Sequence, residues 1–271
     1  MISFFIGSLF LVFFQNIYAQ GLEVTTQREG LKVRFYAQNL GFCPYQCQIT
    51  ILKPSLLDTN SIEPYYVIVP PQSPKVFLFE VKLKKADSEP LTYSKNIVMG
   101  DPNTVKHEDN FIYMLPFMHR QKFRLIQGYN GRFSHQRQYA LDFKMPEGTP
   151  ICAIREGTVI ETRFDSEKGG KDASFADDAN YIIIYHRDGT FAHYWHLKAG
   201  GVAVKPGQKV NAGDIIGYSG NTGWSSTPHL HLVVKKPAYL KMVSIPTLYL
   251  IKKNKKKYLR SWARYKAYHP R

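Results

Sequence analysis

Two histidines separated by a single residue lie in the apolar stretch TPHLHLVV, residues 227–234. The apolar run predicts a strand, and side chains at positions i and i+2 of a strand point to the same face. His229 and His231 would therefore face one spot. A packed or surface pair of histidines is one explanation, and a metal centre with a base beside it is the other. Residues elsewhere in the chain must decide between them.

Three more segments carry side chains suited to the same chemistry: SHQRQYALDF (134–143), AHYWHL (192–197) and SGNTGWSS (219–226). A catalytic zinc site needs three protein ligands and an open position for water, whose pKa the metal lowers to about 7. A neighbouring base must take the proton of that water, and a donor must stabilise the oxyanion that forms. Histidine suits both tasks, because it titrates near neutral pH. One carboxylate and several histidines from separate strands would be a sufficient set.

Residues 128–234 resemble the M23 (lysostaphin-like) zinc metallopeptidases. The resemblance rests on four segments in a fixed order: ALDFKMPEGTPICAIREGTVI, HRDGTFAHYWHL, VKPGQKVNAGDIIGYSGNTG and PHLHL. It covers less than half of the chain but nearly all of the predicted catalytic domain. The resemblance implies a Zn²⁺ cofactor and hydrolysis of peptide bonds in peptidoglycan stems or cross-bridges by a metal-activated water.

The resemblance also assigns roles to individual residues. His135 and Asp142 match the first pair of metal ligands of the family, and His231 matches the third ligand. His196 and His229 match the pair that activates water and stabilises the transition state. By this reading, His231 holds the metal and His229 stands beside the water on the same face of one strand.

One departure from the family pattern concerns the first ligand pair. The usual motif is a histidine, three residues and an aspartate, whereas six residues separate His135 from Asp142. A longer loop before the strand would return His135 to the metal, because loops accept insertions at a small entropic cost. His119 is the alternative first ligand. His193 falls outside the family pattern and is predicted to be structural.

The composition predicts an all-β protein. Aromatic residues make up 14% of the 271 residues, and Gly and Pro recur between short apolar runs, which favours strands and turns over long helices. Residues 20–105 predict an antiparallel β-sandwich accessory domain, and a polar linker is expected over 94–110. Residues 106–237 predict a compact, Gly-turn-rich antiparallel β catalytic domain. Residues 238–271 form a basic, strand-like extension that is expected to pack back on that domain.

Residues 1–19 contain no charge and have the length of a signal peptide. A retained anchor is the alternative, although the apolar run is short for a membrane span of about 20 residues. The sequence thus predicts an exported chain, periplasmic, secreted or in the cell envelope, with no stable membrane insertion after signal cleavage. In that setting Cys43 and Cys47 could form a local disulfide, and Cys152 reads as a buried apolar residue.

The formal net charge is +15, and residues 251–271 hold nine Lys and Arg residues and no acid. Such a surface attracts polyanions, which for an exported chain are anionic envelope polymers. No nucleic-acid motif is present, so nucleic acid is not an expected partner. Two functions follow: a zinc endopeptidase acting on peptidoglycan peptides, or a non-catalytic envelope module that binds the wall or activates another hydrolase. The complete set of five site residues favours the enzyme.

Overall fold

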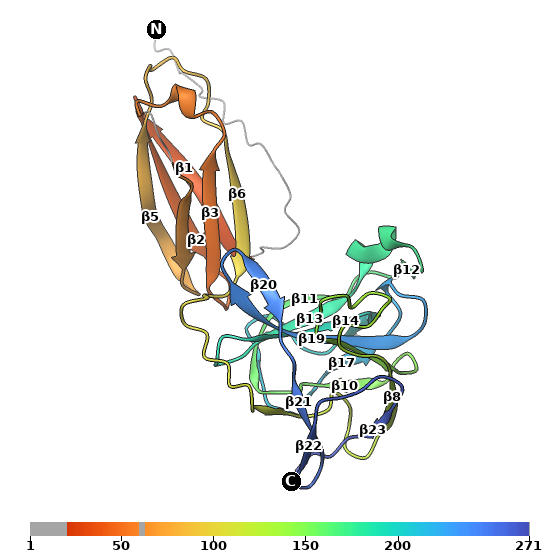
Figure 1. Cartoon of the computed structure of the whole chain (residues 1–271). Coiled ribbons are helices and arrows are strands. Elements are labelled where there is room, and N and C mark those ends of the chain that lie inside the picture. Colours follow the sequence, from red (N-terminus) through yellow and green to blue (C-terminus); the bar gives the residue numbers. More distant parts are fainter. Residues whose placement is uncertain (1–20, 60–62, 271) are drawn as a thin grey trace.

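The structure is a computed structural model that describes residues 21–59 and 63–270. Strands dominate it, and the helices among these residues are two short 3-10 turns, η1 (Pro54–Leu56) and η2 (Ala173–Asp178) (Figure 1). The predicted all-β fold class is confirmed. The predicted signal peptide, residues 1–19, lies outside the described residues. Within the described part, no helix is long and apolar enough to cross a membrane.

Two three-stranded antiparallel sheets form the N-terminal part of the structure. One contains β1 (Leu22–Glu29), β2 (Lys32–Asn39) and β5 (Ser73–Lys82), and the other contains β3 (Tyr45–Ile51), β4 (Tyr65–Val69) and β6 (Tyr93–Met99). The sheets enclose an apolar core, in which the ring of Phe35 stacks on that of Phe79 with centroids 4.4 Å apart. This arrangement is a β-sandwich.

Part of the predicted linker is a strand. Residues 94–99 belong to β6, which lies at the edge of its sheet and pairs with β3. Ser94 and Asn96 are exposed, whereas Ile97 and Met99 turn towards the core. An edge strand with one solvated face alternates polar and apolar residues. The polar residues of this strand resemble those of a linker, so the sequence alone did not distinguish the two.

The three cysteines are free and buried. The structure therefore lacks the local disulfide considered for Cys43 and Cys47. Burial raises the pKa of Cys43 to about 12 and that of Cys47 to about 11, so both behave as small apolar core residues. Cys152 is also buried, as predicted.

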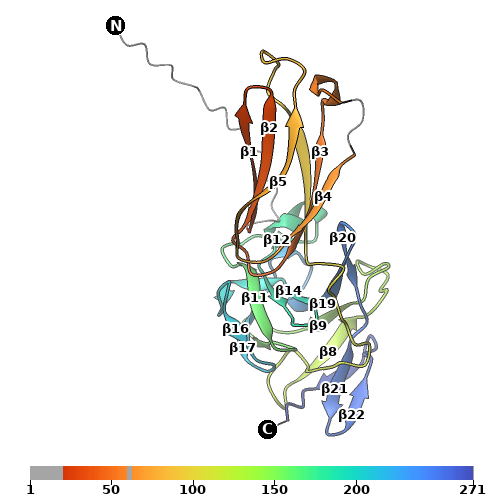
Figure 2. The same ribbon diagram turned by 90° about the vertical axis from the view of Figure 1, so that its left-hand side faces the viewer.

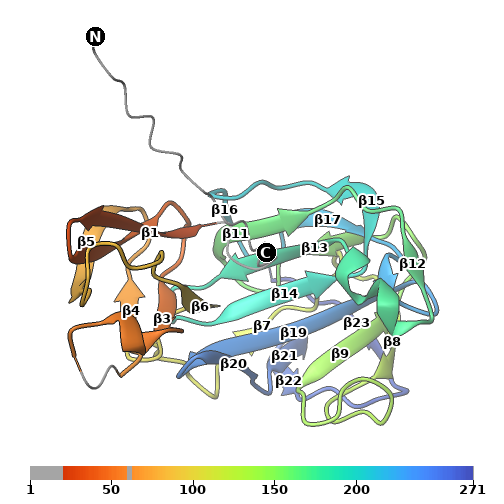
Figure 3. The ribbon, with the colours of Figure 1, turned by 90° about the horizontal axis from the view of Figure 1, so that it is seen from above.

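A nine-stranded sheet organises the second half of the chain, with the strand order β16-β11-β13-β14-β19-β9-β8-β23 and β20 paired to β19 (Figure 3). Its strands are antiparallel to their neighbours. Their bounds are β8 (Lys122–Gln127), β9 (Ala140–Lys144), β11 (Gly157–Arg163), β13 (Tyr181–Tyr185), β14 (Phe191–Trp195), β16 (Lys209–Val210), β19 (His229–Ala238), β20 (Lys241–Ser244) and β23 (Arg264–Lys266).

The two faces of this sheet have different surroundings. A smaller sheet of β10 (Pro150–Cys152), β17 (Ile215–Ser219) and β15 (Leu197–Val202) belongs to the same core as one face. The main-sheet residues in this core include Leu141, Phe143, Tyr194, Leu230 and Leu232. Because side chains alternate along a strand, the intervening residues of β9, β14 and β19 point to the opposite face.

The N-terminal sandwich packs on that opposite face. Ile183 of β13 and Phe191 of β14 are buried in the same apolar cluster as the sandwich core. The backbone N–H of Leu240, beyond the end of β19, donates to Oε1 of Gln46 at 2.8 Å. Figures 1 and 2 show the sandwich rising from one end of the large sheet. The sheet face beside it is the one that carries the histidines.

Short pairings complete the fold. β12 (Gly169–Gly170) runs parallel to β18 (Gly223–Trp224). In the C-terminal segment, β21 (Leu248–Lys252) pairs with β22 (Lys255–Lys257) and, in parallel, with β7 (Ile112–Tyr113). Tyr249 is fully buried in the core of the second half, whereas the lysines of β22 are exposed. The C-terminal segment thus packs back on the preceding strands with its lysines outward.

Two Phe→Ala substitutions test whether packing between the sandwich and the large sheet stabilises the fold. Phe191→Ala is expected to lower the free energy of unfolding by about 3–5 kcal/mol, because it empties a fully buried site between the sandwich and the sheet. Phe133→Ala, at a position that is 85% exposed, is expected to change it by less than about 0.5 kcal/mol. Chemical denaturation of both variants measures the difference. Equal losses would contradict the assignment of Phe191 to this junction.

Candidate metal centre

The register of two neighbouring strands brings a carboxylate and an imidazole together. β19 lies between β14 and β9, and His231 stands opposite Asp142 on one side and opposite Trp195 on the other. Directly opposed residues have Cβ atoms about 4.5–5.5 Å apart and share a face. Nδ1 of His231 lies 2.9 Å from Oδ1 of Asp142. The sheet itself therefore fixes two of the predicted ligands.

A folded loop supplies the third predicted ligand. Residues 128–139 connect β8 to β9, and the backbone N–H of Asn130 donates to the carbonyl of Gln138 at 2.8 Å, which closes the loop. Asn130 and Arg137 have φ angles of 54° and 60°, in the left-handed region that reverses the chain direction tightly. His135 is fully buried at the turn of this loop. The six-residue spacing is thus accommodated by a compact loop that returns His135 to Asp142.

Three ligand atoms converge at this point. Nε2 of His135 lies 3.2 Å from Oδ2 of Asp142 and 3.2 Å from Nδ1 of His231. Ligands at about 2.0–2.1 Å from a tetrahedral zinc are separated by about 3.3 Å. Two imidazole nitrogens and one carboxylate oxygen are also a donor set that zinc accepts. The residues present therefore fit a zinc ion with three protein ligands.

Electrostatics within the cluster keep the carboxylate charged. Burial alone would raise the pKa of Asp142, but hydrogen bonds with His135 and His231 outweigh it and hold that pKa well below its usual range. For His135, burial acts to lower the pKa, and the contact with Asp142 more than compensates, so the pKa is raised. An ionised carboxylate buried among imidazoles is the arrangement that attracts a divalent cation.

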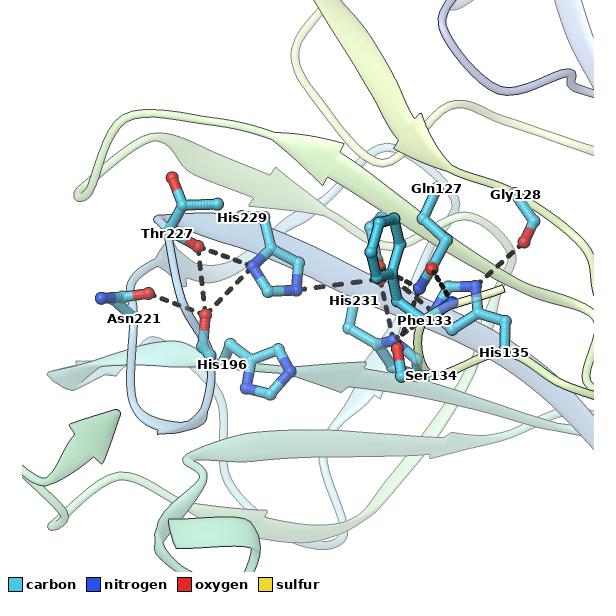
Figure 4. Close-up of polar contacts among 12 residues, drawn as sticks. Gln127, Gly128, Phe133, Ser134, His135, His196, Asn221, Thr227, His229 and His231 are labelled. Carbon is cyan, nitrogen blue, oxygen red and sulfur yellow. Dashed lines mark hydrogen bonds and ion pairs between the residues drawn. The ribbon is translucent and has the colours of Figure 1, made fainter. Parts of the chain in front are cut away.

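Backbone carbonyls orient three of the histidines, and Figure 4 shows two of these contacts, those of His135 and His229. Nδ1 of His135 lies 3.0 Å from the carbonyl oxygen of Gly128, Nδ1 of His229 lies 2.7 Å from that of Thr227, and Nδ1 of His196 lies 2.7 Å from that of Thr222. A carbonyl only accepts, so Nδ1 carries the proton in each ring. When a ring with this hydrogen bond is neutral, its Nε2 is free to bind a metal or accept a proton.

His196 and His229 lie together beside the metal ligands. Their ring centroids are 4.7 Å apart, and Nε2 of His229 is 3.8 Å from Oδ1 of Asp142. Burial, followed by the nearby His229 and His231, lowers the pKa of His196 to about 3. His196 is thus a neutral imidazole at neutral pH in the metal-free protein.

The backbone at His196 is unusual. His196 lies between β14 and β15 with a φ of +64°, a conformation that costs a non-glycine residue on the order of 1 kcal/mol. Its hydrogen-bond partner Thr222 precedes Gly223, which has a φ of +77° and where a Cβ atom would stand 2.4 Å from that of Ala179. The turn at residues 221–223 therefore needs glycine, and it supplies the carbonyl that orients His196.

An open groove leads to the cluster. It has a volume of about 670 Å³, and Asp142, His196, His229 and His231 line it. Three aromatic residues on its walls are strongly exposed: Phe133 at 85%, Trp262 at 64% and Trp224 at 48%. The metal ligands are therefore accessible from one side, where an extended peptide could lie against the sheet.

Not every histidine considered in the sequence joins this cluster. His119 accepts a hydrogen bond at Nδ1 from the backbone of His269 in the C-terminal segment and is not among the three grouped ligands. His193 points to the same face as Trp195 but is buried between the cluster and the sandwich. The structure thus places His135, and not the alternative His119, beside Asp142.

Gln127 is a residue that the sequence did not single out. Its side-chain amide donates to Oδ2 of Asp142 at 3.0 Å and to Oγ of Ser134 at 2.8 Å. Its Oε1 accepts from the backbone N–H of Phe133 at 3.2 Å. Gln127 therefore ties the carboxylate of β9 to the loop that carries His135. Its position at the end of a strand, directly before a glycine-rich loop, was the only signal in the sequence.

Comparisons with known proteins identify a family model and several similar proteins. Residues 136–242 match the family model described as Peptidase family M23, and the match begins one residue after His135. An uncharacterized metalloprotease of Buchnera aphidicola is 30% identical over 199 residues, which cover 70% of this chain and 46% of that protein. The peptidoglycan DD-endopeptidase ShyA of Vibrio cholerae is 39% identical over 39% of this chain and 22% of its own length.

Two further relatives come from staphylococci. The glycyl-glycine endopeptidase ALE-1 of Staphylococcus capitis is 39% identical over 34% of this chain and 23% of its own length. Among solved structures, the catalytic domain of lysostaphin from Staphylococcus simulans is 34% identical over 42% of this chain and 79% of that chain, with a TM-score of 0.32. The chain spans less than half the length of each of the curated relatives described here.

Removing the amide of Gln127 tests how the loop and the carboxylate are coupled. Gln127→Ala is expected to weaken zinc binding about 10- to 100-fold, as is typical when the partner of a metal ligand is lost. The matched control is Gln138→Ala, an exposed side chain of the same loop. Competition with a zinc-binding dye measures both affinities. Equal affinities for Gln127→Ala and the unmodified chain would show that the loop holds His135 without this residue.

Proposed function

Through residues 136–242 the chain belongs to peptidase family M23, and from this premise we propose that it is a zinc-dependent endopeptidase. Its substrates in this proposal are the peptide stems or cross-bridges of peptidoglycan. The observation that carries the proposal is the convergence of His135, Asp142 and His231, whose ligand atoms lie 2.9–3.2 Å apart at the base of an open groove.

In the proposed mechanism, His135, Asp142 and His231 hold the zinc ion. The ion would supply a water of lowered pKa and polarise the carbonyl of the bond to be cleaved. His229 presents its Nε2 next to this position, and its Nδ1 is fixed by the carbonyl of Thr227. Nε2 of His229 takes the proton of the attacking water and can return it to the leaving amine.

His196 is proposed to act from the opposite side of the same space. Its ring lies 4.7 Å from that of His229 and 5.9 Å from that of His231. The left-handed backbone and the bond to Thr222 hold the ring in place, so little reorganisation is needed during the reaction. Nε2 of the neutral His196 ring carries no proton, because Nδ1 donates to the carbonyl of Thr222. It would first have to accept a proton from the reacting groups, and the imidazolium could then donate to the carbonyl oxygen on which negative charge develops.

The names of the relatives suggest two kinds of bond. ShyA is named a DD-endopeptidase of peptidoglycan, and ALE-1 a glycyl-glycine endopeptidase. Both names indicate hydrolysis of peptide bonds, which supports the reaction class proposed here. The alternative is a non-catalytic envelope module, and the presence of all five site residues in one group favours the enzyme over it.

We also propose that the mature chain is exported and that its basic surface contacts anionic envelope polymers. The uncharged residues 1–19 support export as a signal peptide. The exposed lysines of β22 and its turn, Lys253 and Lys255–Lys257, support the contact with polyanions. Export brings the enzyme to peptidoglycan, and the lysines would hold it near an anionic wall.

A digest of purified peptidoglycan tests the proposed activity. The chain with zinc is expected to release new peptide ends, seen by mass spectrometry, and a chelator is expected to abolish them until zinc is restored. His229→Ala is expected to slow the release about 10²- to 10⁴-fold, because the proton acceptor is lost. His119→Ala, outside the cluster, serves as the control.

Zinc content and product release together distinguish the zinc endopeptidase from the non-catalytic module. Release at an unchanged rate in His229→Ala, or release that continues in the presence of the chelator, would contradict the mechanism. Full zinc content without any product would favour the non-catalytic module. His135→Ala with unchanged zinc content would remove His135 from the site.

A further inference from the structure

A lysine faces the groove a short distance from the metal ligands. Lys235 lies on β19 four residues after His231, so the two side chains point to the same face of the strand. Lys235 lines the same groove as His229 and His231 and is half-buried. At about 3.3 Å per residue, its backbone stands about 13 Å from that of His231. The side chain therefore belongs to the wall along which a bound peptide would extend.

The ammonium group of Lys235 has no counter-ion within residues 21–59 and 63–270. No carboxylate or other acceptor forms an ion pair or hydrogen bond with it there, and burial lowers its pKa. Taking a charge out of water is costly unless an opposite charge or hydrogen-bond acceptors replace the solvent. A lysine kept in such a place is suited to an anion that arrives from outside the chain.

A second unpartnered polar side chain lies beside it. His193 stands opposite Val233 on the neighbouring strand and points to the same face as Lys235. It is 4% exposed, and neither of its ring nitrogens has a hydrogen-bond partner among the described residues. An unsatisfied buried imidazole N–H is costly. His193 thus offers a donor next to the ammonium group.

The surroundings of this pair do not neutralise it. Glu161 lies in the same row of the sheet as His193, but β13 separates their strands. Its carboxylate accepts a hydrogen bond from the hydroxyl of Tyr181. On the strands next to Lys235, its register partners are Phe191 and Ser244, neither of which is an acid. The positive charge at this end of the groove is therefore uncompensated.

We propose that Lys235, with His193 beneath it, forms a subsite that binds a free carboxylate of the substrate peptide. The inference rests on the proposed function, and it narrows the substrate class. With about 3.3 Å per residue of an extended peptide and the reach of a lysine side chain, the carboxylate lies two to four residues from the bond that is cleaved. A carboxylate-bearing stem peptide meets this condition, whereas an uncharged all-glycine bridge does not.

The test measures binding and needs no turnover. The full chain with His229→Ala and bound zinc is titrated by calorimetry at neutral pH with the stem-type pentapeptide L-Ala-γ-D-Glu-L-Lys-D-Ala-D-Ala. Two further peptides carry a carboxamide in place of the α-carboxylate of D-Glu or of the C-terminal carboxylate. One of these replacements is expected to weaken binding about 10-fold, because a charge-assisted hydrogen bond is lost.

Variants of two adjacent lysines identify the residue responsible. Lys235→Met, in the same His229→Ala background, keeps the apolar part of the side chain and removes its charge. This variant is expected to bind the free-acid peptide as weakly as the His229→Ala chain binds the carboxamide peptide of lower affinity. Lys235→Arg is expected to retain the preference for the acid. Lys236→Met removes an equal charge from the opposite face of β19 and is expected to have no effect.

Three results would overturn the inference: no measurable binding of the pentapeptide, equal binding of the acid and both amides, or equal weakening of acid and amide by Lys235→Met. Because the titration does not depend on catalysis, it is separate from the test of the proposed function. A failed digest together with a retained preference for the carboxylate would reject the endopeptidase and keep the subsite.

Discussion

The pairing of β9 with β19 is the constraint on which the site depends. It sets the carboxylate of Asp142 against the imidazole of His231 with Nδ1 and Oδ1 2.9 Å apart. A shift of the register by one residue would move one of these side chains to the other face of the sheet. Apolar residues that alternate with these side chains along the two strands, such as Leu141 and Leu230, fix the register because they fill the core on the other face of the sheet. The metal site is thus positioned by the packing of the opposite face.

Loops complete the site through backbone hydrogen bonds. His135, His196 and His229 each direct Nδ1 at a carbonyl oxygen, which leaves Nε2 for the metal or for proton transfer. The carbonyl of Thr222 belongs to a turn with a left-handed φ at Gly223, and the backbone of His196 itself has a left-handed φ. The strained backbone conformations persist because the packed strands on either side of these turns hold them in place. The histidines therefore keep one orientation, which suits proton transfer at a defined place.

The sequence predicted which residues form the site better than it predicted how the strands that carry them pair. Alternation in PHLHL was enough to predict a strand with His229 and His231 on one face, and the histidine and aspartate types predicted zinc chemistry. The pairing of His231 with Asp142 joins segments 89 residues apart, and no local pattern encodes such a pairing.

Loop geometry was equally hidden from the sequence. The return of His135 depends on two left-handed residues, Asn130 and Arg137, of which only asparagine favours that conformation. Gln127 acts through contacts across the same loop, so its role required the folded chain. Lys235 could have been found, because its spacing of four from His231 places both on one face of a strand.

The N-terminal sandwich is part of the environment of the site. It covers Ile183 and Phe191 on the same sheet face that carries His231 and Trp195. Pro237, two residues beyond Lys235, lies so close to the sandwich that a Cβ atom on Gly100 would stand 2.8 Å from its ring. Without the sandwich, an apolar face would be exposed to water directly beside the groove. The sandwich therefore bounds the face on which a peptide can lie, and it places the uncompensated charge of Lys235 near that boundary.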